Sequence, residues 1–216
     1  EGKLKGHKDV IIQDLPGIYS LSPYTLEEVV SRNYLVNEKP DSIIDIVDGS
    51  NIERNLYLTT QLIEIGVPVV IALNMIDVVR KNGDTIDIKK LGDALGCEVI
   101  ETSALKGVGS KEVAERAIGL AKSKVPYSAP HIFSESLEKS LAQIEDIVRE
   151  NINESNSRWL SIKLFERDEK ILKQVELKDD LKDRIEDIIV SCEKKFGDDS
   201  ESIITNERYS YINKLI

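Results

Sequence analysis

Short apolar runs alternate with amphipathic stretches through the first 125 residues of the chain. The runs are rich in β-branched residues, as expected of buried strands, whereas the stretches between them show the apolar spacing of helices. The predicted strands are residues 9–13, 42–47, 67–73 and 99–101. The predicted helices are residues 25–36, 51–65, 88–95 and 110–121. This alternation predicts an α/β fold with a mostly parallel sheet and flanking helices.

Turn-forming residues support these assignments. Residues 5–8 read Lys-Gly-His-Lys and predict a hairpin turn that leads into the first predicted strand. Gly66 and Gly96 stand where helices commonly end, because glycine adopts the left-handed conformation that closes a last helical turn.

Beyond residue 125 the apolar positions show helical spacing alone. Pro126 and Pro130 break regular structure and predict a linker. Residues 159–165 form a short apolar stretch that we expect to close a helical bundle, with Trp159 in its core. Two longer helical stripes are predicted at Leu137, Leu141, Ile144 and Val148, and at Leu181, Ile185, Ile188, Ile189, Cys192 and Phe196. We therefore predict an α/β domain over 1–124 and a small all-α domain over 125–216.

Charge narrows the range of partners. The chain has 29 basic and 39 acidic side chains, a formal net charge of -10. A surface that holds nucleic-acid phosphates rewards clustered lysine and arginine, so we expect no nucleic-acid partner.

Cysteine content and hydropathy give two further expectations. Cys97 and Cys192 are far apart and form no paired motif, so the sequence predicts two buried, reduced thiols without a disulfide or zinc site. The longest apolar run, residues 67–73, is far shorter than the roughly 20 residues that span a bilayer, so we expect the chain as given to be soluble.

The first chemical motif is Asp14-Leu15-Pro16-Gly17, directly after a predicted strand. In open α/β sheets ligands bind at the carboxyl ends of the strands. A carboxylate at Asp14 can reach a hydrated Mg²⁺ between two phosphates, and Gly17 lets a backbone N–H approach the γ-phosphate. Alone, the pattern D-x-x-G is weak evidence and is usually a turn.

The second motif, Asn74-Met75-Ile76-Asp77, follows the most apolar predicted strand. A carboxylate at Asp77 can accept hydrogen bonds from guanine N1–H and the exocyclic amine, whereas adenine would leave it unpaired. Asn74 can tie the base to neighbouring loops. The alternative interpretation is an ordinary polar turn, because asparagine and aspartate favour turns.

The third motif is Ser103-Ala104-Leu105, after the last predicted strand. We expect the N–H of Ala104 to donate to guanine O6 and Ser103 to make the loop rigid. The three motifs stand in the order and at the strand exits of a small-GTPase-like nucleotide site, and this combination favours guanine binding over three unrelated turns.

One expected motif is absent. No G-x-x-x-x-G-K-[ST] stretch precedes Asp14, so we expect the first strand, the phosphate loop and the first switch to be missing from this chain. That absence predicts a gap or an exposed edge in the sheet.

Longer strings around these motifs resemble the cytosolic G domain of the FeoB family, bacterial ferrous iron transport protein B. The resemblance rests on residues 14–24 running into Glu27 and Glu28, on residues 74–77 and 102–107, and on Asp48-Gly49 followed by residues 51–56. It covers residues 1 to about 122. The helices that follow stand where this family carries a helical domain that restrains nucleotide release.

The resemblance implies a GTP- and GDP-binding regulatory domain attached to a membrane Fe²⁺ permease of the same parent protein. It implies Mg²⁺ as a cofactor, with Asp14 as its protein ligand. It also implies a location at the cytoplasmic face of the bacterial inner membrane, and it leaves a homo-oligomer open. The implied nucleotide-binding residues are Asp14, Leu15, Pro16, Gly17, Asn74, Met75, Asp77, Ser103, Ala104 and Leu105.

We assign no catalytic residue. Ile18 follows Gly17 where Ras-like enzymes place a water-orienting glutamine, so the resemblance predicts slow GTP hydrolysis. Two alternatives remain at this point: a helical interaction module on a catalytically inactive α/β scaffold, and a GTPase of ribosome or tRNA maturation. The acidic charge counts against the second.

Overall fold

The computed structural model describes residues 2–4, 6–22, 25–123, 127, 129–152 and 156–216. The chain divides into an α/β unit, Glu1–Ile63 and Val67–Ala129 with Ile216, and a helical unit, Pro130–Leu215 with Glu64–Gly66. The predicted fold class is thus confirmed. The boundary at 124/125 stays a prediction, and residues 124–126 and 128 of the predicted linker lie outside the described residues.

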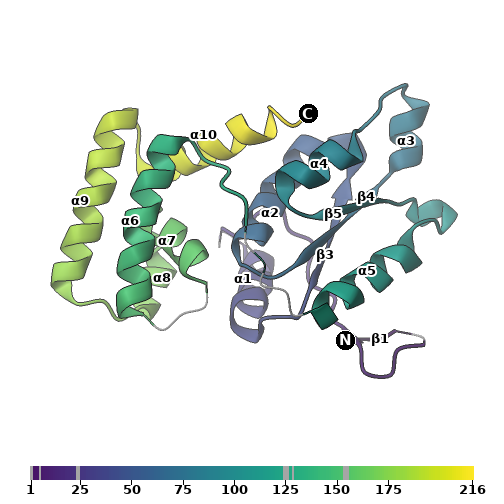
Figure 1. Ribbon diagram of the computed structural model, residues 1–216, viewed down its shortest axis with the longest axis horizontal. Coiled ribbons are helices and arrows are strands. Elements are labelled where there is room, and N and C mark those ends of the chain that lie inside the picture. The colour runs from purple at the N-terminus through teal and green to yellow at the C-terminus, as the bar shows by residue number, and fades with distance from the viewer. Residues whose placement is uncertain (1, 5, 23–24, 124–126, 128, 153–155) are drawn as a thin grey trace. The chain divides into compact units, whose positions relative to one another are not determined.

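The sheet of the α/β unit has three parallel strands in the order β3 (Ile43–Asp48), β4 (Val69–Asn74) and β5 (Glu98–Glu101) (Figure 1). The central strand β4 is buried over Val69–Leu73. Because the strands are parallel and in register, their carboxyl ends meet at one edge of the sheet. The loops that carry the predicted site follow these ends.

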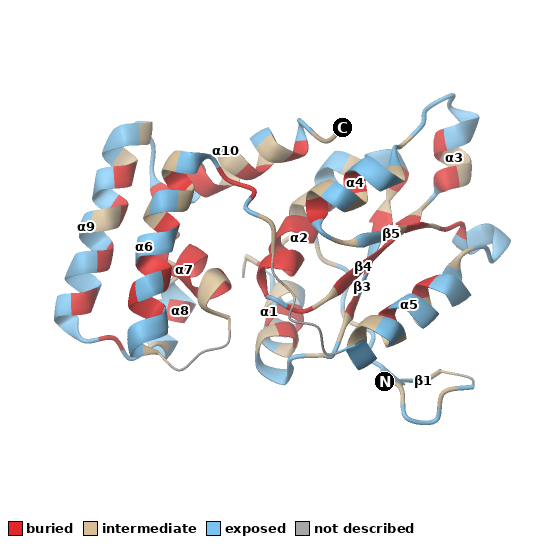
Figure 2. Ribbon diagram, viewed as in Figure 1, coloured by how far each residue is buried: buried red, intermediate tan, exposed pale blue. Residues whose placement is uncertain are grey.

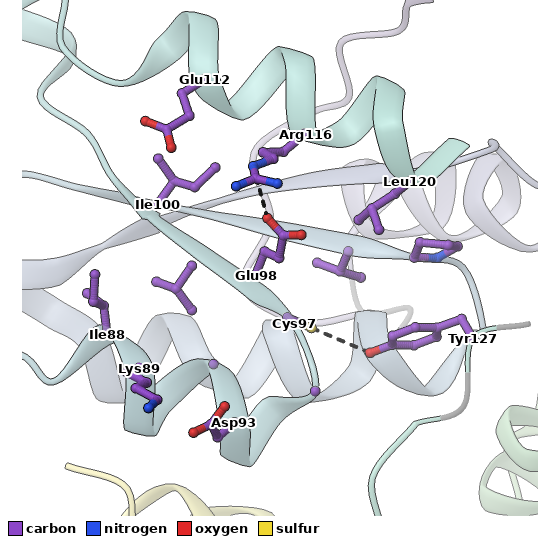
Figure 3. A pocket seen from close by; sticks show the side chains of 15 residues that line it. Ile88, Lys89, Asp93, Cys97, Glu98, Ile100, Glu112, Arg116, Leu120 and Tyr127 are labelled. Carbon is purple, nitrogen blue, oxygen red and sulfur yellow. Dashed lines mark hydrogen bonds and ion pairs between the residues drawn. The ribbon is translucent and has the colours of Figure 1, made fainter. Parts of the chain in front are cut away.

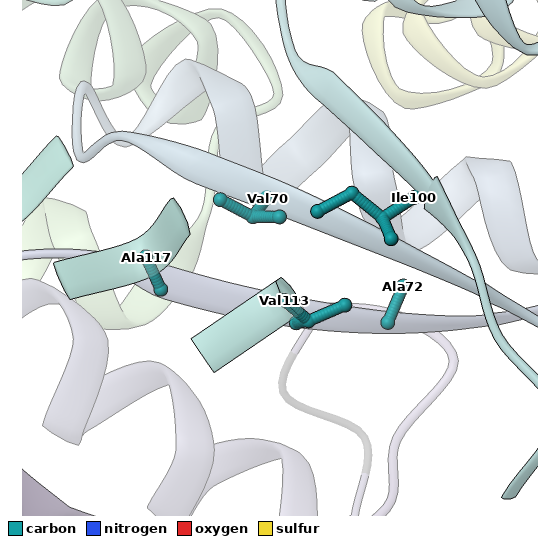
Figure 4. Packing of buried hydrophobic residues seen from close by; sticks show 5 residues of the cluster. All are labelled: Val70, Ala72, Ile100, Val113 and Ala117. Atoms are coloured by element: carbon teal, nitrogen blue, oxygen red, sulfur yellow. The ribbon is translucent and has the colours of Figure 1, made fainter. Parts of the chain in front are cut away.

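Helices cover both faces of this sheet. Figure 1 shows α2 (Ile52–Glu64) and α4 (Ile88–Leu95) on one side and α5 (Ser110–Ser123) on the other. The core under α5 contains Val70, Ala72, Ile100, Val113 and Ala117 (Figure 4). Full burial of a valine or isoleucine contributes about 1.5–3 kcal/mol, so this contact is a major attachment of α5 to the sheet.

The outer part of the same face is uncovered. Ile44 and Ile46 of β3 share the face of Val70 and Ala72, yet they are 39% and 68% exposed. Among the described residues no strand pairs with the outer edge of β3. This edge agrees with the gap that the absent motif predicts.

The segment before Asp14 differs from its prediction. The hairpin is confirmed, because β1 (Gly2–Lys3) pairs antiparallel with β2 (Ile11–Ile12). The expectation of a buried strand is wrong, because Ile11 and Ile12 are 64% and 42% exposed. The physical reason is that β2 pairs with β1 and not with the three-stranded sheet, so its side chains do not enter the core of that sheet.

Local signals explain where several helices begin and end. Helix α1 (Leu26–Asn33) begins with a capping box, in which Thr25 Oγ1 accepts from the Glu28 N–H and Glu28 Oε2 accepts from the Thr25 N–H. A π-helical turn, Tyr34–Glu38, follows it directly. Helix α4 ends at Gly96 with φ 64°, as predicted. Helix α3 (Ile76–Lys81) was not predicted.

The helical unit contains α6 (Glu135–Asn151), α7 (Ser157–Phe165), α8 (Glu169–Gln174), α9 (Asp179–Phe196) and α10 (Ser200–Ile212). Helix α7 contacts α6, α8 and α9, and its residues 159–165 are all buried (Figure 2). The predicted core roles of this stretch and of Trp159 are confirmed. None of the described helices has the length and apolar character needed to cross a membrane.

A guanidinium joins three parts of the helical unit. Arg167, with φ 53°, donates to Glu186 and Glu193 of α9 and to Ser200 of α10. Its left-handed backbone closes the end of α7, where the Asp168 N–H donates to the Lys163 carbonyl at 3.0 Å.

A second arginine is completely buried. Arg208 of α10 is 0% exposed and donates to both carboxylate oxygens of Glu64, at 2.7 and 2.6 Å. Its guanidinium also lies 5.2 Å from the centre of the Phe133 ring. A bidentate pair of this kind satisfies both charges where water is excluded.

Candidate functional site at the carboxyl edge of the sheet

The loops after β4 and β5 bring the second and third motifs together. Asn74 is the last residue of β4, and the Thr102 N–H donates to the Leu73 carbonyl at 2.8 Å. That bond continues the parallel pairing one step beyond β5. It sets Ser103 and Ala104 beside Asn74 and Asp77.

Asn74 binds the neighbouring loop directly. Its Oδ1 accepts from the Ala104 N–H at 3.1 Å and from Thr102 Oγ1 at 3.5 Å. Met75 follows with φ 63°, the sharp turn that starts α3 and directs Asp77 toward the third motif. The Ala104 N–H, which we predicted from the sequence to donate to guanine O6, thus donates to Asn74 in this structure.

Asp77 has a polar partner at each carboxylate oxygen. Ser103 Oγ donates to Oδ1 at 3.1 Å, and Lys106 Nζ lies 3.6 Å from Oδ2. The Ser103 hydrogen bond, with a smaller contribution from the Lys106 charge, lowers the pKa of Asp77. The carboxylate is therefore ionised and oriented at neutral pH. The Lys106 contact was not predicted.

A glycine closes the third loop. Ser103 and Val108 pair as an antiparallel bridge, and Gly109 follows with φ 83°. A Cβ at Gly109 would clash with the carbonyl oxygen of Glu101. This position therefore requires glycine, which the K-G-x-G pattern after Leu105 signals in the sequence.

The exit of β3 reaches the same edge. Asp48 accepts from the Ser50 N–H at 2.9 Å, from the Ser50 hydroxyl at 2.7 Å and from Asn51 Nδ2 at 3.3 Å. Partial burial would raise the pKa of Asp48, but these bonds lower it overall. A Cβ at Gly49 would lie 3.1 Å from the Asn74 carbonyl oxygen, so the turn passes close behind Asn74.

The first motif lies apart from this group. Asp14, Pro16 and Gly17 are exposed, and Ser31 Oγ donates to the Pro16 carbonyl at 3.4 Å. Within the part of the chain that the structure describes, no hydrogen bond or ion pair joins residues 14–17 to Asn74 or Asp77. A Cβ at Gly17 would meet nothing within 4 Å, so its backbone is open to approach.

A separate hollow lies at the amino ends of β4 and β5, away from the predicted site (Figure 3). Its volume is about 590 Å³. Arg116 pairs with Glu98 at 3.3 Å in its wall, and Cys97 Sγ lies 3.4 Å from the Tyr127 hydroxyl. Burial raises the pKa of Cys97 to about 11, so the thiol is protonated and unreactive at neutral pH.

The sequence predicts that Cys97 and Cys192 are both buried, reduced thiols. Both are free thiols; Cys192 is buried, but Cys97 is only half-buried. The described residues contain no cluster of three or more His, Cys, Asp or Glu side chains that could hold a metal ion.

Two protein-family models match this chain. The model described as ferrous iron transport protein B matches residues 1–117, and the model of the FeoB cytosolic helical domain matches residues 133–216. The chain belongs to the FeoB family. The resemblance seen in the motifs is thus confirmed, and neither alternative function is favoured.

Curated FeoB relatives are similar over nearly the whole chain. The Fe(2+) transporter FeoB of Methanocaldococcus jannaschii is 37% identical over 222 residues, which is 100% of this chain and 32% of that protein. The Fe(2+) transport protein A/Fe(2+) transporter FeoB fusion protein of Porphyromonas gingivalis is 34% identical over 224 residues, 96% of this chain and 26% of that protein. The chain thus spans about a third or less of these relatives.

Solved FeoB structures share the fold. A single-site mutant of S. thermophilus NFeoB bound to GMPPNP has a TM-score of 0.93 and 44% identity, over 99% of this chain and 83% of that one. S. thermophilus NFeoB bound to GDP.AlF4- and K+ has a TM-score of 0.93 and 45% identity, with the same coverage.

Proposed function

We propose that this chain is the guanine-nucleotide-binding regulatory part of an FeoB Fe²⁺ transporter, which binds GTP and GDP and hydrolyses GTP slowly. The observation that carries the proposal is the bonded group Asn74, Asp77, Ser103 and Ala104 at the carboxyl edge of the sheet. The similar S. thermophilus structures with GMPPNP and with GDP support it.

Base recognition is assigned to Asp77. Guanine offers two donors, N1–H and the exocyclic amine, to the two oxygens of an ionised carboxylate. Ser103 and Lys106 hold that carboxylate in place from the protein side. Adenine lacks the matching donors, and sites that depend on such pairing reject the wrong partner by roughly 10⁴-fold. Asn74 fixes the adjoining loop, and Met75 and Leu105 flank the base.

Phosphate sensing is assigned to the first motif, residues 14–17. The exposed Asp14 carboxylate fits Mg²⁺, which binds one or two protein carboxylates and otherwise phosphates and waters. Bound Mg²⁺ would neutralise part of the negative charge of the phosphates. The open backbone at Gly17 suits an N–H that donates to the γ-phosphate. Ile18 has no group that orients water, in keeping with slow hydrolysis.

The remaining roles follow from the family. We assign residues 1–124 to the G domain and 125–216 to a helical domain that restrains nucleotide release. The membrane permease of the same parent protein is the proposed partner, at the cytoplasmic face of the inner membrane. The net charge of -10 supports the absence of a nucleic-acid partner; a homo-oligomer is compatible with this assignment.

Replacement of Asp77 by asparagine tests the assignment. Asp77→Asn should move binding preference from guanosine to xanthosine nucleotides, because xanthine carries an acceptor at C2 where guanine carries a donor. Asp84→Asn, an exposed carboxylate just after α3, is the matched control and should keep the guanosine preference. An unchanged guanosine preference in Asp77→Asn would overturn the proposal.

A further inference from the structure

The segment Ile18–Ser22, directly after Gly17, is attached to the protein at one buried point. Leu21 is 0% exposed, whereas Tyr19, two residues earlier, is 54% exposed. The segment has no helix or strand of its own. Its position therefore depends on the side chains that hold it.

Helix α2 supplies the hydrogen-bonding hold. Gln61 Oε1 accepts from the Leu21 N–H at 2.7 Å and from the Ser20 hydroxyl at 3.2 Å. The Ser20 oxygen accepts in turn from the Ser22 N–H at 3.0 Å. One glutamine oxygen thus organises three consecutive residues of the segment.

The same helix holds the segment at a second place. Arg54 stacks on the Tyr19 ring, with its Cζ 3.7 Å from the ring centroid. Arg54 and Gln61 are seven residues apart, close to two helical turns, so they project from one face of α2. That face is a surface against which residues 19–21 rest.

Only one end of the Gln61 side-chain amide, the Oε1 oxygen, has hydrogen-bond partners among the described residues. The residue is 2% exposed, and among the described residues its Nε2 donates to no acceptor. A buried donor without a partner costs about 1–3 kcal/mol, which a well-packed protein normally avoids. The cost is recovered if the neighbouring segment has another arrangement in which one of its carbonyls accepts from Nε2.

We propose that Gln61 is a positioning residue for two arrangements of Ile18–Ser22: its Oε1 holds Leu21 in the arrangement described here, and its Nε2 donates to a carbonyl of the segment in the other. Gly17 is four residues from Leu21, so the state of Gln61 limits where the Gly17 N–H can lie. The inference rests on the proposed function, in which that N–H meets the γ-phosphate.

Two substitutions separate hydrogen bonding from packing. Gln61→Met fills a similar volume without an acceptor, whereas Gln61→Glu keeps acceptor oxygens. Amide hydrogen exchange followed by NMR should show Leu21 exchanging at least tenfold faster in Gln61→Met, but close to the wild-type rate in Gln61→Glu. A role in packing alone predicts the reverse order, because methionine avoids a buried carboxyl; that result, or unchanged Leu21 exchange in Gln61→Met, would overturn the inference.

Nucleotide addition tests the second arrangement. With GMPPNP the wild-type chain should lose Leu21 protection relative to GDP, and Gln61→Met should show no such difference. Equal Leu21 protection with bound GMPPNP and bound GDP would overturn the two-arrangement inference. Failure to bind either nucleotide would count against the proposed function, while Leu21 exchange without nucleotide would still report the hold by Gln61. Ser20→Ala, which leaves the Leu21 bond in place, is the control.

Discussion

The hydroxyl of Ser103 donates a hydrogen bond to Asp77 Oδ1 at 3.1 Å, across two loops that are 26 residues apart in the chain. This contact links the second and third motifs and lets the loop after β5 orient the carboxylate after β4. The group proposed to recognise guanine (Asn74, Asp77, Ser103 and Ala104) is thus held together by hydrogen bonds within the protein.

Loss of the Ser103 hydroxyl should raise the pKa of Asp77. In the folded chain the pKa of Asp77 lies below its ordinary value. The hydrogen bond therefore stabilises the folded chain at pH values above the ordinary carboxyl pKa, and this stabilisation is lost as the pH falls through the folded pKa. Ser103→Ala should therefore destabilise the chain at neutral pH but much less in acid. NMR titration of the Asp77 carboxyl carbon measures the pKa directly.

The matched control for this prediction is Ser123→Ala, an exposed serine at the end of α5. It should leave the Asp77 titration unchanged. An Asp77 pKa that does not move in Ser103→Ala would show that the hydrogen bond is not what stabilises the carboxylate.

A buried carboxyl in the sheet predicts an opposite pH dependence. Asp45 of β3 is 7% exposed and accepts from Thr59 Oγ1 at 2.6 Å. Burial raises its pKa from 3.8 to about 6, an effect that the Thr59 bond only partly offsets. The folded chain thus favours the protonated carboxyl, and stability falls as pH rises through about 6.

Asp45→Asn should remove this penalty while keeping an acceptor for Thr59. At about 1.4 kcal/mol for each pKa unit, the expected gain is about 3 kcal/mol at pH 8, with little gain near pH 4. Urea unfolding at both pH values measures it. Asp41→Asn, an exposed position before β3, is the control; equal effects of the two substitutions at pH 8 would refute the burial argument.

The ion pair of Arg208 with Glu64 predicts a strong asymmetry between single and double substitutions. Arg208→Met leaves the 3% exposed Glu64 side chain charged and without its bidentate partner, and should cost about 3–5 kcal/mol. Arg208→Met combined with Glu64→Leu removes both charges and should cost much less. Denaturant unfolding followed by the fluorescence of buried Trp159 measures both variants.

Arg184→Met, on the exposed side of α9, provides the comparison for Arg208 and should change stability by at most about 0.5 kcal/mol. A double variant as unstable as Arg208→Met alone would mean that lost packing, and not the stranded Glu64 charge, dominates the effect.

Much of the fold follows from the sequence because local signals agree with the tertiary packing. The β-branched run of β4 and the glycine at position 96 predict their elements well, since burial and backbone conformation are decided locally there. The burial of the strand at Ile11 and Ile12 was not predicted correctly, because it depends on which strand lies beside it.

Features missed in the sequence depend on long-range contacts. From the sequence alone, a glutamine within a helix is expected to face solvent. Only the packing of residues 18–22 on α2 shows that Gln61 is buried. Helix α10 was not predicted, because the charged Arg208 takes one of its buried positions and interrupts the apolar spacing. Lys106 approaches Asp77 only once β4 and β5 pair.

Binding of a fluorescent GDP analogue to the purified chain, followed by separate competition with GTP and ATP, tests the central claim most directly. We expect GTP to displace the analogue and ATP to fail at comparable concentrations, because the proposed site presents the Asp77 carboxylate to the two donors of guanine, which adenine lacks. Displacement by ATP as readily as by GTP would contradict the assignment of this edge of the sheet to guanine recognition.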